Sequence, residues 1–286
     1  MFNPAFCGTK RVLDFRLFYR NQWDGFAGAP KTYAASLNFR LAEGKVGLGG
    51  FAFNDEIGPF KTTYAGGTFA FHIKMDDIEL SFGVQGIYMN QTFNSSKVTL
   101  HNSVDRAIDL TNSSTVKGTD GSVGLLLVND RFYLGVGINN IVSREFLHYE
   151  KTPPYKGKYK NEPSYTVGAA YNYAENENYT FENSVMALYT SGVPIYFDYT
   201  LRLHIQKVLL TGISIRVKDA VALHLGVTLK NKLQIAYSYD VITSPLKKYN
   251  QNSHEISLVF SSNMGTDKKK HGFNNRFLKQ KFQYLL

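Results

Sequence analysis

Apolar and polar residues alternate with a period of two over long stretches of the chain. The first such segment has apolar residues at one parity and polar residues at the other: Leu13, Phe15, Leu17 and Tyr19 against Asp14, Arg16 and Arg20. This period gives a β-strand one apolar and one polar face. The pattern is clear at 193–205 and 232–241, but in the glycine-rich segments 45–54 and 61–74 it assigns no face. It predicts fourteen strands, at 12–20, 31–41, 45–54, 61–74, 77–90, 120–129, 131–141, 164–173, 178–189, 194–205, 207–217, 220–230, 232–243 and 253–262.

The connections between these strands differ in length according to their order in the chain. If the N-terminus is periplasmic, the odd connections of an outer-membrane barrel are external and long, whereas the even ones are tight turns. Every connection of six residues or more is odd: 21–30, 55–60, 91–119, 142–163 and 244–252. Two odd connections, near Gly192 and Asp219, are short. A soluble sandwich has no reason to sort its loops in this way. We therefore predict an all-β fold, a transmembrane antiparallel β-barrel of about 14 strands.

Composition is compatible with a barrel and excludes helical membrane spans. The 286 residues are 14% aromatic, and the mean hydropathy is −0.24. No apolar run approaches the roughly 18 residues that a membrane helix needs, whereas barrel strands are only half apolar. Several tyrosines lie near strand ends, where they suit the membrane–water boundary: Tyr19, Tyr33, Tyr88, Tyr173, Tyr179, Tyr189 and Tyr196. Cys7 is the single cysteine, so the chain forms no internal disulfide.

Three regions are expected: a periplasmic lead-in at 1–11, the outer-membrane barrel at 12–262 and a basic tail at 263–286. Because the first residues lack a basic start and an apolar core, we expect an export signal that was removed or lost at a truncated start. The tail carries six basic residues against one acidic residue, or +5 of the net charge of +9. It is either an amphipathic helix on a partner or membrane surface, or disordered. Nucleic acid is not an expected partner, because the strands lack clustered Lys and Arg with interleaved aromatics.

Charged residues fall on the polar parity of many strands: Asp14, Arg16, Glu79, Glu182, Asp198, Arg202, Arg216, Lys230, Asp240 and Glu255. Inside a barrel these side chains would face the lumen, where opposite charges pair. Structural pairing is the favoured interpretation. The functional interpretation is a path for ions or a peptide, or a seat for a plug.

The histidines and serines do not form a recognisable catalytic or metal site. His204 and His224 lie on polar faces of nearby strands, but a metal site needs three or four converging ligands and no third candidate is found. In Ser253-His254-Glu255 the residues are contiguous, so in a strand His254 points away from both neighbours. These three residues cannot form a catalytic triad. We therefore expect no catalytic residue, no cofactor, no metal and no enzymatic activity.

Residues 21–30 connect the first two strands and contain the only tryptophan, Trp23. Glycine and proline in this connection allow a tight backbone path. A rigid indole can either anchor the loop at the lumen mouth or grip an exported protein. Anchoring is favoured, because Arg20 and Asp24 flank the ring and are placed to lock it inward. The candidate partner-binding or loop-locking residues are Arg20, Gln22, Trp23, Asp24, Pro30, Asn54 and Asp55.

Short motifs follow one another in order over roughly residues 3–260. They are Asn3-Pro4-Ala5-Phe6, Tyr19-Arg20-Asn21-Gln22-Trp23, Gly28-Ala29-Pro30, Gly47-Leu48-Gly49-Gly50, Asn54-Asp55-Glu56-Ile57-Gly58-Pro59, Leu80-Ser81-Phe82-Gly83, Tyr237-Ser238-Tyr239-Asp240 and Ser253-His254-Glu255-Ile256. No single motif is specific, but the ordered set resembles the PorP/SprF family of outer-membrane proteins. One departure is Cys7-Gly8-Thr9, where a small residue, Gly and Ser would be expected.

The resemblance implies an accessory outer-membrane barrel of the type IX secretion and gliding motility machinery. Such a barrel would aid secretion or surface anchoring of large adhesins by protein binding. The implied partners are a secreted adhesin or other type IX client, a periplasmic secretion-machinery or peptidoglycan-linked lipoprotein, and outer membrane lipid. The alternative is an outer-membrane channel for small apolar solutes, because fourteen strands enclose a lumen of ligand size. A hydrolase in the barrel wall is disfavoured by the missing triad.

Overall fold

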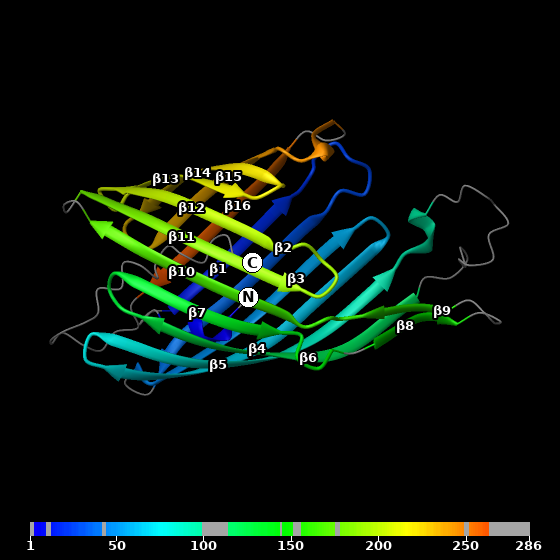
Figure 1. Ribbon diagram of the computed structural model, residues 1–286, viewed down its shortest axis with the longest axis horizontal. Helices are drawn as coiled ribbons and strands as arrows, with labels where there is room; N and C mark the ends of the chain where they lie inside the picture. Colours follow the sequence, from blue (N-terminus) through cyan, green and yellow to red (C-terminus); the bar gives the residue numbers. More distant parts are fainter. Residues whose placement is uncertain are drawn as a thin grey trace.

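The computed structural model is a closed antiparallel β-barrel (Figure 1). The structure describes residues 3–9, 13–41, 44–98, 114–143, 145–150, 156–174, 178–248 and 252–262. Within these residues fourteen strands form the wall, in the order β1-β16-β15-β14-β13-β12-β11-β10-β7-β6-β5-β4-β3-β2. The ring closes where β1 pairs with β16. The predicted fold class is confirmed.

The wall strands are β1 (Leu13–Asn21), β2 (Lys31–Leu41), β3 (Val46–Ile57), β4 (Phe60–Met75), β5 (Ile78–Phe93), β6 (Ser114–Val128), β7 (Phe132–Asn139), β10 (Ser164–Ala174), β11 (Tyr179–Thr190), β12 (Tyr196–Ile205), β13 (Leu209–Arg216), β14 (Ala220–Leu229), β15 (Leu233–Ile242) and β16 (Ser253–Ser262). A separate hairpin consists of β8 (Glu145–Glu150) and β9 (Lys156–Lys160). Short 3-10 helices are η1 (Pro4–Phe6), η3 (Ser95–Lys97) and η4 (Pro245–Lys248).

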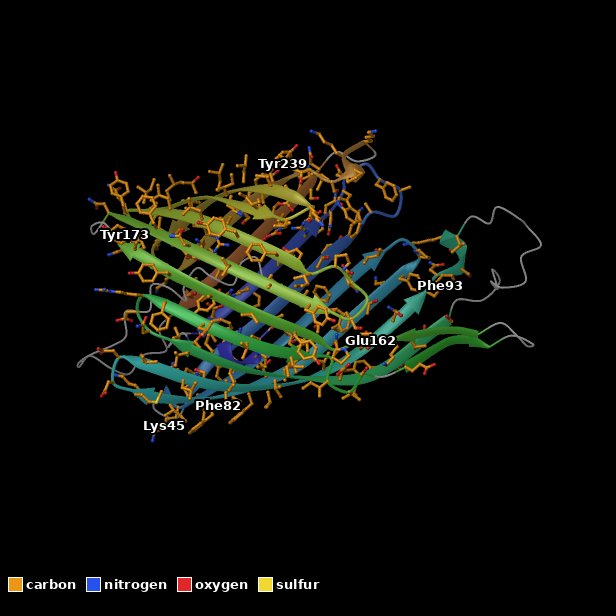
Figure 2. All side chains as sticks on the ribbon, in the orientation of Figure 1. Lys45, Phe82, Phe93, Glu162, Tyr173 and Tyr239 are labelled. Atoms are coloured by element: carbon orange, nitrogen blue, oxygen red, sulfur yellow. The ribbon has the colours of Figure 1, made fainter. Side chains whose placement is uncertain are left out.

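Each wall strand has one side toward the lumen and the other away from the barrel. On β12, Tyr199 and Leu201 are each 37% exposed, whereas Thr200 and Arg202 are each 4% exposed. Figure 2 shows Phe82 of β5 pointing away from the wall in the same manner. Apolar side chains on the outside and polar side chains inside are the arrangement expected of a barrel in lipid. The alternation predicted for these strands is therefore confirmed.

Strand pairing assigns the faces of β3 and β4, which the sequence leaves open. His72 of β4 is buried, whereas Phe69 and Phe71 are exposed. Ala70, which is fully buried, pairs directly with Gly47 of β3. Residues that are directly opposite in an antiparallel ladder share a face, so Gly47 also points into the lumen. The alternation is hidden in the sequence because several positions carry glycine, which has no side chain.

Some predicted boundaries on the long-loop side are wrong. The segment 55–60 is not a loop, because β3 and β4 continue through it to a turn at Gly58, which has φ +57°. β5 continues to Phe93 rather than 90, and β6 begins at Ser114 rather than 120. In this extension Thr92 pairs with Thr115, and their hydroxyl oxygens lie 3.2 Å apart at an exposed position. Such a polar ladder lacks the apolar alternation by which strands are recognised.

The β8–β9 hairpin lies within the segment 142–163, which was predicted to be a loop. β8 contacts β6, and the hairpin projects past the end of the wall beside β6 (Figure 1). β4, β5 and β6 have 16, 16 and 15 residues, whereas β7 and β13 have 8 each. The barrel is therefore taller on the β4–β6 side. Charged residues at both ends of the hairpin hide it from a search for apolar alternation.

Connection length separates the two ends of the barrel in part, because the predicted long-loop end also has the short turns 58–59 and 217–219. At one end the fully described connections are short: 76–77, 129–131, 206–208 and 230–232. The opposite end carries the connection 22–30 and the segment with β8 and β9. No helix among the described residues is long and apolar enough to cross a bilayer. The predicted basic tail at 263–286 lies outside the described residues.

Candidate functional site: the barrel mouth and the lumen

The Trp23 loop lies at the long-loop end of the barrel, beside the start of β16. The backbone N–H of Trp23 donates to the Ser253 hydroxyl at 3.0 Å, and the N–H of Asp24 donates to the Asn252 carbonyl at 2.8 Å. Trp23 has φ +57°, a left-handed conformation that non-glycine residues rarely adopt. The indole is half-buried, and no partner for its Nε1 is found among the described residues. The first loop is thus bonded to the last strand.

The other predicted residues of this loop bond to groups other than the indole. The N–H of Gln22 donates to the Pro30 carbonyl at 2.9 Å and closes the base of the loop. The Asp24 carboxylate accepts a hydrogen bond from the Asn21 amide at 2.8 Å. Arg20 donates to two carboxylates of other strands, as described below. The bonds that hold the loop therefore come mainly from its backbone.

Asn54 and Asp55 belong to β3 and do not join the Trp23 loop. Asn54 donates from Nδ2 to the Thr63 hydroxyl at 2.8 Å on the outer face of the wall. Asp55 accepts from the Thr32 hydroxyl at 2.6 Å. Consecutive residues in a strand point to opposite faces, so these two side chains cannot act in one site. The structure therefore brings together only part of the predicted set.

Arg20 belongs to a buried charge network at the mouth. It donates to Glu255 of β16 at 2.8 Å and to Asp240 of β15 at 2.7 Å. Asp240 also pairs with Arg216 of β13, whose Nε donates to Asp198 of β12 at 3.2 Å. Two guanidinium groups and three carboxylates thus connect five strands across the seam where the barrel closes. Removing one partner of a buried pair leaves an uncompensated charge, which costs about 3–5 kcal/mol.

Charge pairing continues through the lumen, as the sequence predicts. The further pairs are Arg202–Glu182 at 2.9 Å, Arg16–Asp14 at 2.5 Å and Arg40–Glu79 at 2.6 Å. Lys230 is an exception to the predicted inward set. β14 ends at Leu229, and Lys230 lies exposed in the following turn.

Residues 3–9 lie inside the barrel, against β4, β5 and β6, and all seven are buried. Asn3 donates from Nδ2 to the carbonyls of Leu125 and Val136, at 3.0 and 2.9 Å, and its Oδ1 accepts from the N–H of Ala5. The Phe6 ring packs edge-on against Tyr133, with ring centroids 5.2 Å apart. Part of the segment predicted as a lead-in thus fills space in the lumen.

Glycines on the inner wall make room for this N-terminal segment. A Cβ added at Gly83 of β5 would overlap the backbone of Pro4 and Ala5. One added at Gly124 of β6 would overlap the Asn3 side chain. Because backbone atoms cannot move aside as a flexible side chain can, Gly83 in particular is required by the segment. In the sequence, the sign of such a segment is that neighbouring strands carry glycine at positions whose side chains would point into the lumen.

The end of the N-terminal segment is bonded to the wall by Arg40. Its guanidinium donates to the carbonyls of Thr9 and Gly44, at 3.4 and 2.6 Å, while it pairs with Glu79. The Cys7 thiol is 1% exposed, and burial raises its pKa to about 12. A thiol in this environment stays protonated and unreactive at neutral pH.

Register brings together two serine–histidine pairs that the sequence does not predict. In the first, Ser81 Oγ lies 2.7 Å from His72 Nδ1, and both residues are buried. In the second, Ser214 Oγ lies 2.7 Å from His224 Nε2 and 2.5 Å from Thr200 Oγ1. Ser214 and His224 are 2% and 1% exposed, so a solute has no access to the pair. His204 lies 3.5 Å from Glu182 instead. The described residues contain no group of three or more His, Cys, Asp or Glu that could hold a metal ion.

Inward side chains occupy much of the remaining interior. Leu126, Glu182, His224 and Asp240 come from four different strands, and each is at most 1% exposed. Together with the N-terminal segment they make the described part of the lumen a packed interior rather than a wide open pore.

Comparisons with known proteins agree with this architecture. The chain is similar to the Pseudomonas putida toluene transporter TodX, with 12% identity, coverage of 91% of this chain and 92% of that chain, and a TM-score of 0.52. It is also similar to a Pseudomonas aeruginosa FadL homologue, with 10% identity, 91% of each chain covered and a TM-score of 0.50. At these identities the likeness concerns the fold alone. No curated protein matches the chain.

The family comparison covers nearly the whole sequence. The model described as "Type IX secretion system membrane protein PorP/SprF" matches residues 1–260. Together with the closed barrel of outer-membrane type, this match places the protein in the outer membrane. The chain belongs to the PorP/SprF family of type IX secretion system membrane proteins.

Proposed function

We propose that this protein is an accessory barrel of the type IX secretion machinery that holds a secreted client, such as a large adhesin, at the outer surface. The observation that carries the proposal is the family match over residues 1–260. The packed lumen supports binding over conduction, because residues 3–9 and paired charges occupy it. We also propose that the protein acts without catalysis, since both serine–histidine pairs, Ser214–His224 and Ser81–His72, are buried and inaccessible.

The external end offers a surface on which a protein client can bind. In outer-membrane barrels the long loops face outward and the short turns face the periplasm. The tall β4–β6 side and the β8–β9 hairpin therefore project from the cell (Figure 1). Within the described residues β9 pairs with β8 alone. A strand with an open edge can accept a further strand from a partner.

The opposite end would contact the periplasmic partner. Its turns are short and include the exposed residues Lys207, Lys230 and Lys232. We propose that this end binds the secretion machinery or a peptidoglycan-linked lipoprotein. Short turns leave the rim of the barrel close to the membrane surface, where such a partner is held.

Affinity capture of the intact protein from outer membranes, with partners identified by mass spectrometry, tests the proposal. The wild-type barrel should capture a secreted surface protein and a periplasmic component. Replacing residues 145–160 by a short Gly-Ser linker should abolish capture of the surface protein only. The variant Lys207→Ala/Lys230→Ala is the matched control at the short-turn end of the barrel. It should still capture the surface protein. Normal adhesin display in a strain that lacks the protein would contradict the proposed role.

A channel for small apolar solutes is the second candidate. It is favoured by the fold likeness to TodX, a toluene transporter. Liposomes containing the purified protein distinguish the two functions. We expect toluene to cross these liposomes no faster than empty ones. Faster, saturable entry would support the channel.

A further inference from the structure

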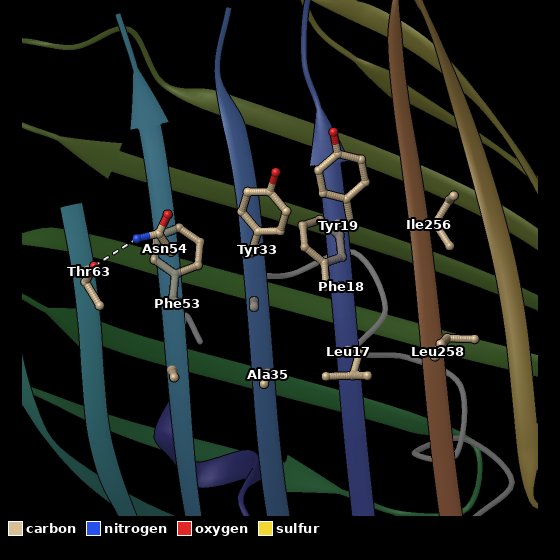
Figure 3. A pocket seen from close by; sticks show the side chains of 12 residues that line it. Leu17, Phe18, Tyr19, Tyr33, Ala35, Phe53, Asn54, Thr63, Ile256 and Leu258 are labelled. Atoms are coloured by element: carbon tan, nitrogen blue, oxygen red, sulfur yellow. Dashed lines mark hydrogen bonds between the residues drawn. The ribbon is translucent and has the colours of Figure 1, made fainter. Parts of the chain in front are cut away.

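The outer face of the wall contains an apolar groove near its external end. The groove has a volume of about 470 Å³ and extends over β16, β1, β2, β3 and β4 (Figure 3). Ala35 and Ala52 lie at its floor, and Leu17, Tyr33 and Leu258 stand around them. Tyr33 and Leu17 are 48% and 41% exposed, so the groove opens away from the lumen. In the membrane it therefore faces lipid.

Strand register arranges the outward residues of β2, β3 and β4 in four levels. Directly paired residues of an antiparallel ladder share a face, so each level runs across the three strands. From the external end inward, the levels are Lys31–Glu56–Lys61, Tyr33–Asn54–Thr63, Ala35–Ala52–Ala65 and Leu37–Gly50–Gly67. The outer surface thus changes from charged to polar to small and apolar over a few residues.

The fold itself does not require the small side chains of the innermost level. A Cβ added at Gly50 or Gly67 would approach other atoms no closer than 3.7 and 3.9 Å, which is ordinary contact. At Gly86, which pairs with Gly67 on the next strand, no atom lies within 4 Å. This contrasts with the inward Gly83, where a Cβ would overlap the N-terminal segment. The outward glycines continue the hollow next to the groove.

Positive charge surrounds the external end of the groove. Lys61 pairs with Glu56 at 3.0 Å, with 58% of its side chain exposed. Lys31 and Lys97 also act electrostatically on the same carboxylate. Asp55, the neighbour of Glu56 in the chain, adds a second carboxylate close to the first, so three ammonium groups stand against two carboxylates. The excess positive charge is available to an anionic group at the membrane surface.

We propose that this groove is a binding site for one phosphorylated glycolipid of the outer leaflet, of the lipid A type. Its phosphate binds Lys31 and Lys61, its sugar lies against Tyr33, Asn54 and Thr63, and an acyl chain occupies the hollow over Ala35 and Ala52. The order of the four levels matches the order of phosphate, sugar and hydrocarbon in such a lipid. A membrane-spanning protein partner would fill the apolar part but would leave the excess of lysines without counter-charge. Charge complementarity therefore favours the lipid.

Native mass spectrometry of the delipidated full-length protein, titrated with diphosphoryl lipid A, tests the site. The wild type should bind one lipid saturably. Lys31→Gln/Lys61→Gln should weaken binding roughly tenfold, the effect of losing two exposed charge contacts to one phosphate. Ala52→Phe, which fills the groove, should also weaken it. Heat-resistant gel mobility confirms that each variant is folded.

Two matched controls define the outcome. Lys207→Gln/Lys230→Gln removes two lysines at the opposite end, and Ala187→Phe adds a ring on β11, away from the groove. Both should bind lipid A as the wild type does. Equal binding by the lysine variant and the wild type would overturn the proposal. If the lysine variant loses binding but Ala52→Phe does not, the lysines contact the phosphate while the acyl chain does not occupy the groove. This result would also contradict the proposal.

Discussion

The Arg20 guanidinium on the first strand donates a hydrogen bond to the Glu255 carboxylate on the last strand at 2.8 Å. The two residues are directly paired where the barrel closes. Glu255 is 3% exposed, so its charge depends on this partner. We predict that Arg20→Met lowers the free energy of unfolding by about 3–5 kcal/mol, because it leaves a buried carboxylate uncompensated. Thermal unfolding in detergent, followed by heat-dependent gel mobility, measures the loss.

Two further variants identify the cause of that loss. Adding Glu255→Gln to Arg20→Met removes the uncompensated charge and should recover part of the stability. Lys160→Met breaks an exposed pair, Lys160–Glu162 at 3.0 Å, and should change stability by at most about 1 kcal/mol. If Arg20→Met unfolds at the wild-type temperature, the network does not stabilise the seam.

The single cysteine reports on the N-terminal segment. Cys7 is buried in the lumen, and burial raises its thiol pKa to about 12, so maleimide should label the native barrel slowly. Gly83→Val should displace the segment, because a Cβ at this position overlaps Pro4 and Ala5. We expect Cys7 to be labelled at least about tenfold faster in this variant while the barrel stays folded.

Gly86→Val is the matched control for that experiment. Gly86 lies on the same strand, but its Cβ would meet no atom within 4 Å. Its labelling rate should equal that of the wild type. Rapid labelling of Cys7 in the wild type itself would be incompatible with a segment held in the lumen.

Lipid contact on β12 gives a prediction that separates the two faces. Leu201 is 37% exposed on the outer face, between the inward Thr200 and Arg202. Leu201→Arg would place a charge in hydrocarbon and should cost roughly 2–4 kcal/mol if the residue lies near the midplane. Leu201→Phe, which stays apolar, should fold with wild-type yield. Unchanged folding yield and heat-resistant mobility of Leu201→Arg would contradict the assigned face.

The sequence predicted the barrel because lipid imposes a period of two on every spanning strand. This alternation is lost in strand segments that extend beyond the lipid bilayer. The Thr92–Thr115 ladder and the β8–β9 hairpin therefore escaped recognition. Connection length was informative for a related reason, since the two ends of the barrel meet different compartments.

The candidate site was predictable only in part. Neighbouring residues of one loop, such as Gln22 and Pro30, come together because the turn itself closes them. Asn54 and Asp55 belong to the predicted set, but both lie in β3, where alternation sends their side chains to opposite faces. The contacts of Asn3 with Leu125 and Val136 span more than a hundred residues. Such contacts depend on register around the ring, which sequence patterns do not supply.

Packing and client binding predict different outcomes for substitutions of Trp23. Its backbone N–H bonds to Ser253, and its half-buried indole lies at the mouth. If packing is its role, Trp23→Ala should lose about 1–2 kcal/mol of stability, the cost of exposing part of a large apolar surface. Trp23→Phe should retain most of it. The amount of captured client should then decrease only as a consequence of the lower stability of the barrel mouth.

The backbone at this position supplies a further control. Trp23 adopts φ +57°, so Trp23→Gly relieves the backbone strain while it removes the same ring as Trp23→Ala. If the indole stabilises the mouth by packing, both variants lose it, and Trp23→Gly is the more stable of the two. Melting temperature and capture of the surface protein are measured on all three variants. Wild-type melting in Trp23→Ala together with lost capture would show that the ring binds the client directly. The packing account would then be wrong, because a ring that anchors the loop cannot be removed without loosening it.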